Sequence, residues 1–409
     1  MPSRMWTVTR CWDGWRMSWR RRSMESQSVP PVPEQLLPGD LVVFQPEFVE
    51  FGGEERVILS LCRELHAQGK PHAVLCYWDS IGLAKYAEWP LKVVELGPKR
   101  NPVSKVLSLR RCLQDIANLG GPVPVLFNIQ SAYHAGLGAH APYHLRIPDT
   151  YSLLSFVPEG TAPVQAPLAT RIKSVVSSAI CHMATRRGIQ NAVHLVTNTA
   201  ALRDEMHQLY DRKAEVIYLG GFGMPMVGTP QRVEAPIELL TVSRLQSSKR
   251  IDWILQALAD IQKSGADYAP WRLHIAGSGP DAAALKALSD SLGLGAQVVF
   301  HGFVSDEQLR ALYARAHVFL MPAKQGYGLP AIEALYQKMG LVVSDESGVV
   351  EILDNTSWVA IARGGKAGFS KALGDMLGRV TQPGFFERAL PDLPMEKTWA
   401  IKLIQHLQW

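Results

Sequence analysis

The sequence predicts an α/β protein in which two Rossmann-like domains face a central cleft. Short apolar stretches alternate with amphipathic stretches of helical spacing, glycines follow several of the apolar stretches, and a glycine-rich linker divides the alternation into two series. Alternating strands and helices with glycine-rich turns are typical of parallel sheets that are covered by helices. Two such sheets joined by a linker predict a ligand-binding cleft between them.

The composition is that of a globular protein with room for two domains. The chain has 409 residues, of which 47% are hydrophobic and 19% are charged, and this excludes a disordered chain. The net charge of +5 suits acidic ligands or an anionic membrane surface, but it is too small to predict nucleic-acid binding. No apolar run is long enough to cross a bilayer. The five scattered cysteines have no metal-ligand spacing, which predicts free thiols in a reducing compartment.

The chain divides into three predicted segments. Residues 1–35 alternate tryptophan with arginine and then become rich in serine and proline, which predicts a disordered or non-native extension. A cationic membrane-surface segment is the alternative for this part. Residues 36–222 form the first Rossmann-like domain, and residues 223–389 form the second.

Apolar runs and helical periodicity give the elements of the first domain. Strands are predicted at residues 40–45, 72–77, 93–96, 123–129, 194–198 and 215–219, and helices at 54–68, 105–119, 171–187 and 199–210. Gly52 and Gly53 lie between the first strand and the first helix. Residues 131–167 are rich in His, Tyr, Gly and Pro and show no clear period, so no element is assigned there.

The same signals give the elements of the second domain. Strands are predicted at residues 238–242, 271–275, 297–300, 318–321 and 341–344, and helices at 250–264, 282–292, 306–315 and 331–338. A final helix is predicted at residues 397–407.

One strand–loop–helix unit in the second domain has the pattern of an anion site. An apolar strand runs into a loop that carries Gly326 and Gly328 around Tyr327, and Pro330 then opens a helix. Free amides at a helix start attract phosphate, and glycines let the backbone approach it closely. Glu333, within the helix, has the chemistry to accept hydrogen bonds from a sugar diol. An ordinary capped turn is the alternative explanation of this stretch taken alone.

Four landmarks follow one another in the second domain and carry a family resemblance. They are S-R-L at 243–245 with Lys249 after it, A-G-S-G-P at 276–280, H-G-F-V at 301–304, and Q-G-Y-G-L-P-A-I-E-A at 325–334. In this order they resemble the retaining GT-B glycosyltransferases of glycosyltransferase family 4. The resemblance extends from Phe44 to about Asp354, and it implies a GT-B fold in which residues 390–409 return to the first domain.

The resemblance also implies an activity and a setting. A hexosyltransferase would move a sugar from a UDP- or GDP-hexose to a glycan or lipid-linked acceptor, in the biosynthesis of a cell-surface polysaccharide or glycolipid. The nucleotide sugar would be a substrate, with no cofactor and no metal. The expected location is cytoplasmic, with peripheral contact to the inner membrane surface. The basic helices at residues 105–111 and 171–187 are candidates for that contact, and a solvated helix face is the alternative.

Roles for individual residues are implied in the same way. Arg244 and Lys249 would clamp the donor diphosphate, and a solvated basic loop is the alternative. Glu351 would orient contacts on the phosphate side. The implied donor-binding residues are Gly52, Gly53, Gly277, Phe303, Val304, Gly326, Tyr327, Gly328, Leu329 and Glu333.

The sequence departs from the family pattern at two catalytic positions. Gln325 stands where the family has the first of two glutamates spaced E-x7-E, so a charge near the transferred sugar is lost. The family also has a functional histidine in the first domain. His134, His140 and His144 are candidates for it, and we assign it to His144.

Two other classes of function remain open at this point. Gln325 and the uncertain histidine allow a non-catalytic nucleotide-sugar binding or scaffold protein. A nucleotide-sugar epimerase of GT-B fold is the second alternative, and it would release free nucleotide diphosphate and sugar without an acceptor. No motif indicates the pyridoxal-phosphate lysine that a phosphorylase would need.

Overall fold

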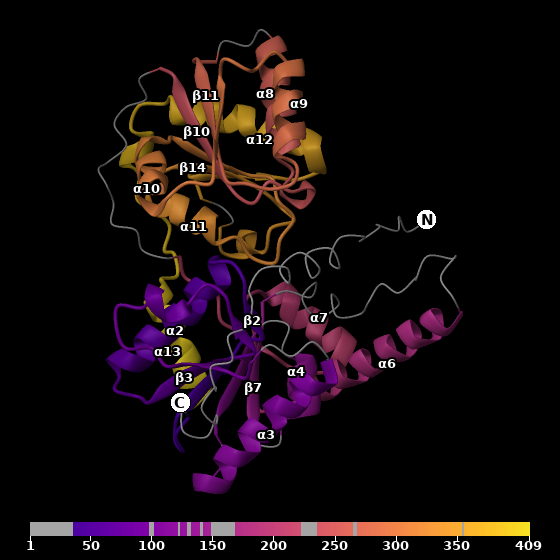
Figure 1. Cartoon of the computed structure of the whole chain (residues 1–409). Coiled ribbons are helices and arrows are strands. Elements are labelled where there is room, and N and C mark those ends of the chain that lie inside the picture. Colours follow the sequence, from indigo (N-terminus) through magenta and orange to yellow (C-terminus); the bar gives the residue numbers. More distant parts are fainter. Residues whose placement is uncertain are drawn as a thin grey trace.

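The computed structural model shows two α/β domains, one above the other in Figure 1. It describes residues 36–97, 102–121, 123–128, 132–139, 142–148, 168–221, 235–264, 268–353 and 356–409. The predicted extension at residues 1–35 and the predicted boundary between residues 222 and 223 lie outside these ranges. Both described sheets of more than two strands are entirely parallel, so the predicted fold class is confirmed.

The first domain contains a seven-stranded sheet in the order β5-β3-β1-β6-β7-β8-β9. Its strands are β1 (Leu41–Phe44), β3 (His72–Cys76), β5 (Val93–Glu95), β6 (Val125–Asn128), β7 (Tyr143–Ile147), β8 (Leu195–Thr197) and β9 (Glu215–Val216). A separate pair consists of β2 (Glu47–Phe48) and β4 (Trp78–Asp79). The described helices are α2 (Gly53–Ala67), η2 (Leu83–Tyr86), α3 (Pro102–Gly120), α4 (Ala132–Gly138), α6 (Leu168–Asn191) and α7 (Ala200–Tyr210).

The second domain contains a six-stranded sheet in the order β12-β11-β10-β13-β14-β15. Its strands are β10 (Ile237–Val242), β11 (Trp271–Ala276), β12 (Val298–Gly302), β13 (Val318–Met321), β14 (Gly340–Ser344) and β15 (Val359–Ala362). The described helices are η4 (Ser247–Lys249), α8 (Ile251–Lys263), α9 (Ala282–Ser291), α10 (Asp306–Arg315), α11 (Leu329–Tyr336), η5 (Gly348–Ile352), α12 (Gly365–Val380) and η6 (Phe385–Glu387).

The central strands are almost entirely buried because helices cover both faces of each sheet. All four residues of β13 and all five of β14 are buried, as expected for parallel strands that read as unbroken apolar runs. Such runs could be found in the sequence, and β13 and α10 have the predicted bounds. The elements that sequence reasoning missed include α4 and β7, which fall within residues 131–167, and β15 and α12 near the end of the second domain.

The last helix, α13 (Glu396–His406), lies in the first domain although the second domain precedes it in the chain. Figure 1 shows α13, in yellow, beside the indigo helix α2. An ion pair of 2.8 Å joins Arg63 of α2 to Glu396 of α13. The segments at Gly220 and Met395 also touch each other, since a Cβ on Gly220 would lie 1.9 Å from the carbonyl carbon of Met395. The end of the first domain's chain and the segment that returns to that domain therefore lie side by side.

A close helix contact supports the outer side of the first domain. A Cβ on Gly136 of α4 would lie 1.9 Å from the carbonyl oxygen of Ala184 in α6, and one on Gly188 would lie 2.0 Å from that of Ala132. Both glycines are thus required by close backbone approach rather than by chain flexibility. Val106 of α3, Tyr133 of α4 and Ala184 pack together beside this contact.

We expect Gly188→Ala to destabilise the first domain, because the added methyl group cannot fit without separating α4 from α6. Overpacking of this kind costs about 1–3 kcal/mol of the free energy of unfolding. Urea unfolding followed by circular dichroism measures it. Gly378→Ala is the matched control, since no atom lies within 4 Å of its Cβ position in α12. That variant should gain about 0.5–1 kcal/mol from helix propensity, and equal effects of the two substitutions would contradict the packing argument.

Candidate active site

A cavity of 380 Å³ lies between the two domains. The second domain contributes the ends of β10 and β13 and the start of α11, and the first contributes Gly53, Glu54, Pro148, Asn198 and Leu219. In the second sheet the strand order reverses between β10 and β13. In open parallel sheets, ligands bind beyond the carboxyl ends of the strands at such a switch point. The cavity therefore lies where this architecture places ligands.

The loop before α11 presents free backbone donors to the cavity. Within the described residues, the amides of Gly326, Tyr327 and Gly328 donate no hydrogen bond, and all three residues line the cavity. Gly328 has a φ of +129°, and a Cβ there would lie 2.8 Å from Nε2 of Gln325. A side chain at this position would be strained and would displace Gln325. These amides, together with the helix dipole of α11, make an anion-binding surface.

Lys249 lies beside this surface and is held by Gln325. Its Nζ donates a hydrogen bond of 2.7 Å to Oε1 of Gln325. The amide of Gln325 in turn lies 3.0 Å from Sδ of Met321 and 3.4 Å from Oγ of Ser347. Burial, and secondarily the nearby charge of Arg244, lower the pKa of Lys249 below its usual value. No carboxylate of the described residues forms an ion pair with this ammonium, and its half-buried charge favours an anionic ligand.

Arg244 also lines the cavity, but it is exposed and contacts the other domain. Its guanidinium lies 2.6 Å from the carboxylate of Glu50, across the opening between the domains. The two side chains are 60% and 70% exposed, so this ion pair contributes little stability. Arg244 can exchange Glu50 for a ligand phosphate at small cost.

The paired glycines of the first domain have separate positions. Gly53 lines the cavity, and its Cβ position lies 3.7 Å from Cδ1 of Leu329, so the starts of α2 and α11 meet there. Gly52 does not line the cavity. Its amide donates to the carboxylate of Glu55 at 2.9 Å, which caps the first turn of α2.

Glu333 is buried within the second domain rather than exposed to the cavity. Only 5% of its surface is exposed, and burial raises the pKa of its carboxyl group. Its oxygens lie 3.7 Å from Arg56 of α2 and 3.3 Å from the hydroxyl of Tyr313. The predicted contact of Glu333 with ribose hydroxyls requires it to leave or share these partners.

Three further predicted residues lie outside the cavity. Phe303 follows β12 and is 86% exposed, which leaves its ring free at the same sheet edge, while Val304 packs against the core. Gly277 follows β11 with a φ of +132°, and a Cβ there would lie 1.9 Å from the carbonyl oxygen of Ser243. Gly277 thus supports the loop that carries Arg244, and it does not line the cavity.

His144 and His134 do not line the cavity either. His144 is buried on β7, where it stacks on His194 with ring centroids 5.0 Å apart and meets the edge of Trp409. Burial lowers its pKa to about 4. His134 accepts or donates a hydrogen bond of 3.1 Å with the hydroxyl of Tyr77, and burial lowers its pKa to about 3. His140 lies outside the described residues. The geometry gives no support to the assignment of His144 as a donor-facing residue, because β7 reaches the cavity at Pro148 instead.

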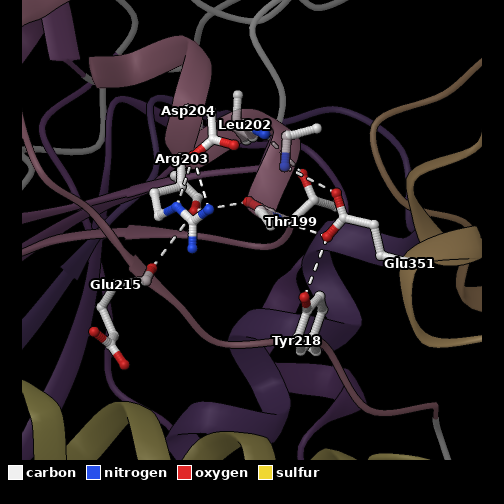
Figure 2. A network of polar contacts seen from close by, with 10 residues as sticks. Thr199, Leu202, Arg203, Asp204, Glu215, Tyr218 and Glu351 are labelled. Carbon is white, nitrogen blue, oxygen red and sulfur yellow. Dashed lines mark hydrogen bonds and ion pairs between the residues drawn. The ribbon is translucent and has the colours of Figure 1, made fainter. Parts of the chain in front are cut away.

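Glu351 connects the two domains instead of facing the phosphate side of the cavity. Figure 2 shows its carboxylate at the start of α7, near Thr199 and Tyr218. The amides of Ala200 and Ala201 donate to it at 2.6 and 2.8 Å, and the hydroxyl of Tyr218 donates at 3.2 Å. A residue of the second domain thus satisfies the free amides of a helix in the first. Our expectation for Glu351 is corrected accordingly.

Sequence reasoning missed the polar residues that the first domain places around the cavity. Glu54 and Asn198 line it, and Arg146 lies behind them with 1% of its surface exposed. The arginine within the apolar stretch Y-H-L-R-I was the available signal, because a charged side chain in a central strand needs a buried partner.

Sequence comparisons with known proteins match mainly the second domain. Residues 229–373 match the family model described as Glycosyl transferases group 1. The match lies in the second domain, and the chain is similar to this family over that part. An uncharacterized glycosyltransferase of Methanocaldococcus jannaschii is 35% identical over 126 residues, which are 30% of this chain and 31% of that protein. A GDP-mannose-dependent alpha-(1-6)-phosphatidylinositol monomannoside mannosyltransferase of Mycolicibacterium smegmatis is 28% identical over 34% of this chain and 38% of that protein. The chain therefore aligns with only about a third of the length of each of these curated relatives. The aligned segments are about as long as the segment that matches the family model.

Solved structures match over both domains of the chain. The apo form of the lipopolysaccharide outer core galactosyltransferase WaaB superposes with a TM-score of 0.65 at 16% identity, covering 90% of this chain and 98% of that one. Anabaena HepE in complex with UDP and glucose superposes with a TM-score of 0.62 at 15% identity, covering 90% and 99%. The predicted GT-B fold is confirmed, and the match of residues 229–373 agrees with the predicted family.

We expect Glu351→Gln to loosen the contact between the domains, because the neutral amide accepts more weakly from α7 and loses the attraction to the helix dipole. Small-angle X-ray scattering should show a larger radius of gyration for this variant in the absence of ligand. Asp375→Asn removes a comparable charge from the exposed face of α12 and serves as the control. An unchanged radius of gyration for Glu351→Gln would contradict the role of this contact.

Proposed function

We propose that this protein transfers a hexose from a nucleotide-diphosphate sugar to a glycan or lipid-linked acceptor. The observation that carries the proposal is the convergence of one partly buried ammonium and three backbone amides on a single cavity. Lys249 and the loop of Gly326 to Gly328 face the cavity from neighbouring strand ends. Their positive charge and donors are complementary to a diphosphate.

In this proposal the donor diphosphate lies against the start of α11. The amides of the loop and the ammonium of Lys249 bind its oxygens, and Arg244 closes over it from the opening. The charge that develops on the leaving diphosphate is stabilised by donors that are already in position. Transfer with retention follows if the acceptor attacks on the face that the diphosphate leaves. The leaving oxygen then takes the proton of the acceptor hydroxyl.

Phe303 and Glu333 remain predictions for the nucleoside. The exposed ring of Phe303 offers a stacking surface for the base at the edge of the second sheet. Glu333 lies one helical turn inside α11 and reaches the ribose only if Arg56 or Tyr313 shares it. The names of the relatives include a GDP-mannose enzyme and a UDP complex, so both bases belong in a donor test.

Two helices of the first domain carry exposed apolar side chains beside basic ones. Val103 and Leu107 of α3, and Ile180 and Met183 of α6, are 45–64% exposed. No helix in the described ranges is both long and apolar enough to cross a bilayer. We propose that α3 and α6 contact the membrane surface at which a lipid-linked acceptor would be presented.

A second candidate function is that of a nucleotide-sugar binding protein without transferase activity. The presence of a glutamine at position 325 favours it. The side chain of Gln325 is neutral, so it adds no negative charge to the cavity, and it is hydrogen-bonded to Lys249, Met321 and Ser347. An epimerase remains a further alternative, distinguished by the release of free sugar and nucleotide diphosphate when no acceptor is present.

Calorimetric titration of UDP, GDP and ADP, and of their hexose conjugates, tests the proposal directly. We expect one nucleoside diphosphate to bind, and Lys249→Ala to weaken its binding by about 10–100-fold through loss of a charged hydrogen bond. Lys286→Ala, on the exposed face of α9, is the control. The absence of binding by every nucleotide would overturn the proposal. Binding without turnover, followed by turnover in Gln325→Glu, would favour the non-catalytic alternative.

The low pKa of Lys249 predicts that nucleotide affinity falls in the alkaline range. A bound diphosphate requires the ammonium form, so affinity is full below the pKa of Lys249 in the free protein and is lost as the pH rises through it. The loss should approach about tenfold for each pH unit above that value. Calorimetry across the alkaline range measures it. In Lys249→Arg the guanidinium stays charged, and a decline that persists in this variant would assign the titration to another group.

Membrane contact predicts that Leu107→Glu and Met183→Glu each weaken binding to vesicles that contain anionic lipid. We expect a decrease of about tenfold, because each change removes apolar area from the interface and adds repulsion. Co-sedimentation with vesicles measures it. Val299→Glu, at an exposed apolar position of the second domain, should bind like the unmodified protein. Equal binding by all three variants would contradict the proposed surface.

A further inference from the structure

The first-domain wall of the cavity holds a polar cluster of Glu54, Arg146 and Asn198. We propose that Glu54 and Asn198 bind hydroxyl groups of the transferred hexose, so that the first domain supplies the carboxylate that is missing at Gln325. The inference rests on the proposed function, because it assigns a sugar-binding role within the same cavity.

Arg146 determines the geometry of the cluster. Its Nη1 donates to Oε2 of Glu54 at 2.8 Å, and its Nη2 lies 3.5 Å from Oδ1 of Asn198. Nη1 also donates to Asn128 at 2.7 Å, and the ring of Trp399 lies 5.6 Å from the guanidinium. A guanidinium that is 1% exposed must keep its partners, since an unpaired buried charge is very costly. Arg146 is therefore a positioning residue that fixes Glu54 and Asn198.

The positions of these two side chains leave one acceptor and one donor without partners. Oε1 of Glu54 accepts no hydrogen bond from a described residue, and the side chain of Glu54 is 31% exposed. Nδ2 of Asn198 is buried and has no partner among the described residues, although Asn198 lines the cavity. Buried polar atoms without partners are uncommon in native proteins and often mark a ligand site. A carboxylate oxygen and an amide nitrogen match the donor and acceptor functions of a sugar diol.

The charges around the cavity indicate which part of a donor lies here. Among the described residues that line it, Glu54 has the only carboxylate. The diphosphate is favoured at the opposite side, where Lys249 and the amides of Gly326 to Gly328 offer positive charge and hydrogen-bond donors and there is no lining carboxylate among the described residues. Gly53, the neighbour of Glu54, meets Leu329 at the start of α11. A sugar attached to a diphosphate at α11 therefore extends toward Glu54.

Glu54 also has an electrostatic consequence for the transfer. As the bond from the sugar to the leaving oxygen lengthens, positive charge develops at the anomeric carbon. A carboxylate fixed near that carbon stabilises the charge. Gln325 is neutral and hydrogen-bonded to Lys249, so it cannot do so. The carboxylate of Glu54, in the first domain, thus compensates for the charge that Gln325 does not provide in the second.

The test compares the affinity for the free nucleoside diphosphate with the affinity for its sugar conjugate, in the unmodified protein and in three variants. Glu54→Gln is isosteric and keeps an acceptor for Arg146, and Asn198→Ala leaves the pair of Glu54 and Arg146 intact. For both variants we expect the affinity for UDP or GDP to stay within about twofold. We expect the additional affinity that the hexose confers to be lost, and kcat/KM to fall about 10–100-fold. Glu88→Gln, which removes an exposed charge from the same domain, should match the unmodified protein.

The outcomes separate this inference from the proposed function. Normal nucleotide binding and turnover, with both variants unchanged in hexose affinity and in kcat/KM, would overturn the inference alone. Failure of the unmodified protein to bind any nucleotide would overturn the proposed function and the inference with it. If Glu54→Gln strongly lowers the melting temperature, Asn198→Ala becomes the deciding variant. A loss of hexose affinity in Asn198→Ala at an unchanged melting temperature would support the sugar site, and unchanged hexose affinity would overturn it.

Discussion

The arrangement of the cavity depends on one backbone constraint, the turn that joins β13 to α11. Gly328 adopts a conformation that other residues avoid, and its Cβ position is already occupied by neighbouring side chains. This turn directs three amides into the cavity, sets the start of α11 against Gly53, and holds Gln325 where it meets Lys249. A larger residue at this position would disturb all three relationships at once, so the anion surface and the domain contact share one structural origin.

The two domains contribute opposite chemistry to the cavity. The second domain provides an ammonium, a guanidinium and free amides, whereas the first provides a carboxylate and a side-chain amide held by a buried guanidinium. Because these groups come from separate domains, their relative position depends on contacts such as that of Glu351 with α7. The distribution of charge and the closure of the domains are therefore linked.

Much of the second domain could be predicted from sequence because its signals are local. Unbroken apolar runs gave β13 and β14, and the glycines before α11 marked the turn. The residues that the first domain contributes to the cavity could not be found from local signals. Glu54 and Asn198 lie far apart in the chain, and they meet only through Arg146, whose strand falls in a stretch without clear periodicity. Glu333 and His144 had the expected residue types, but burial and the direction of their side chains place them outside the cavity.

The ion pair between Arg244 and Glu50 gives the cavity a charged entrance that dissolved salt can loosen. Both side chains are largely in water, so mobile ions screen their attraction over distances of about 8 Å at physiological ionic strength. The same ions also screen the attraction of Arg244 for an incoming anion. Added salt therefore has two opposed effects on ligand entry: it releases Arg244 from Glu50, and it weakens the long-range attraction of Arg244 for the ligand. We expect the association rate to be highest at an intermediate ionic strength, where these two effects balance.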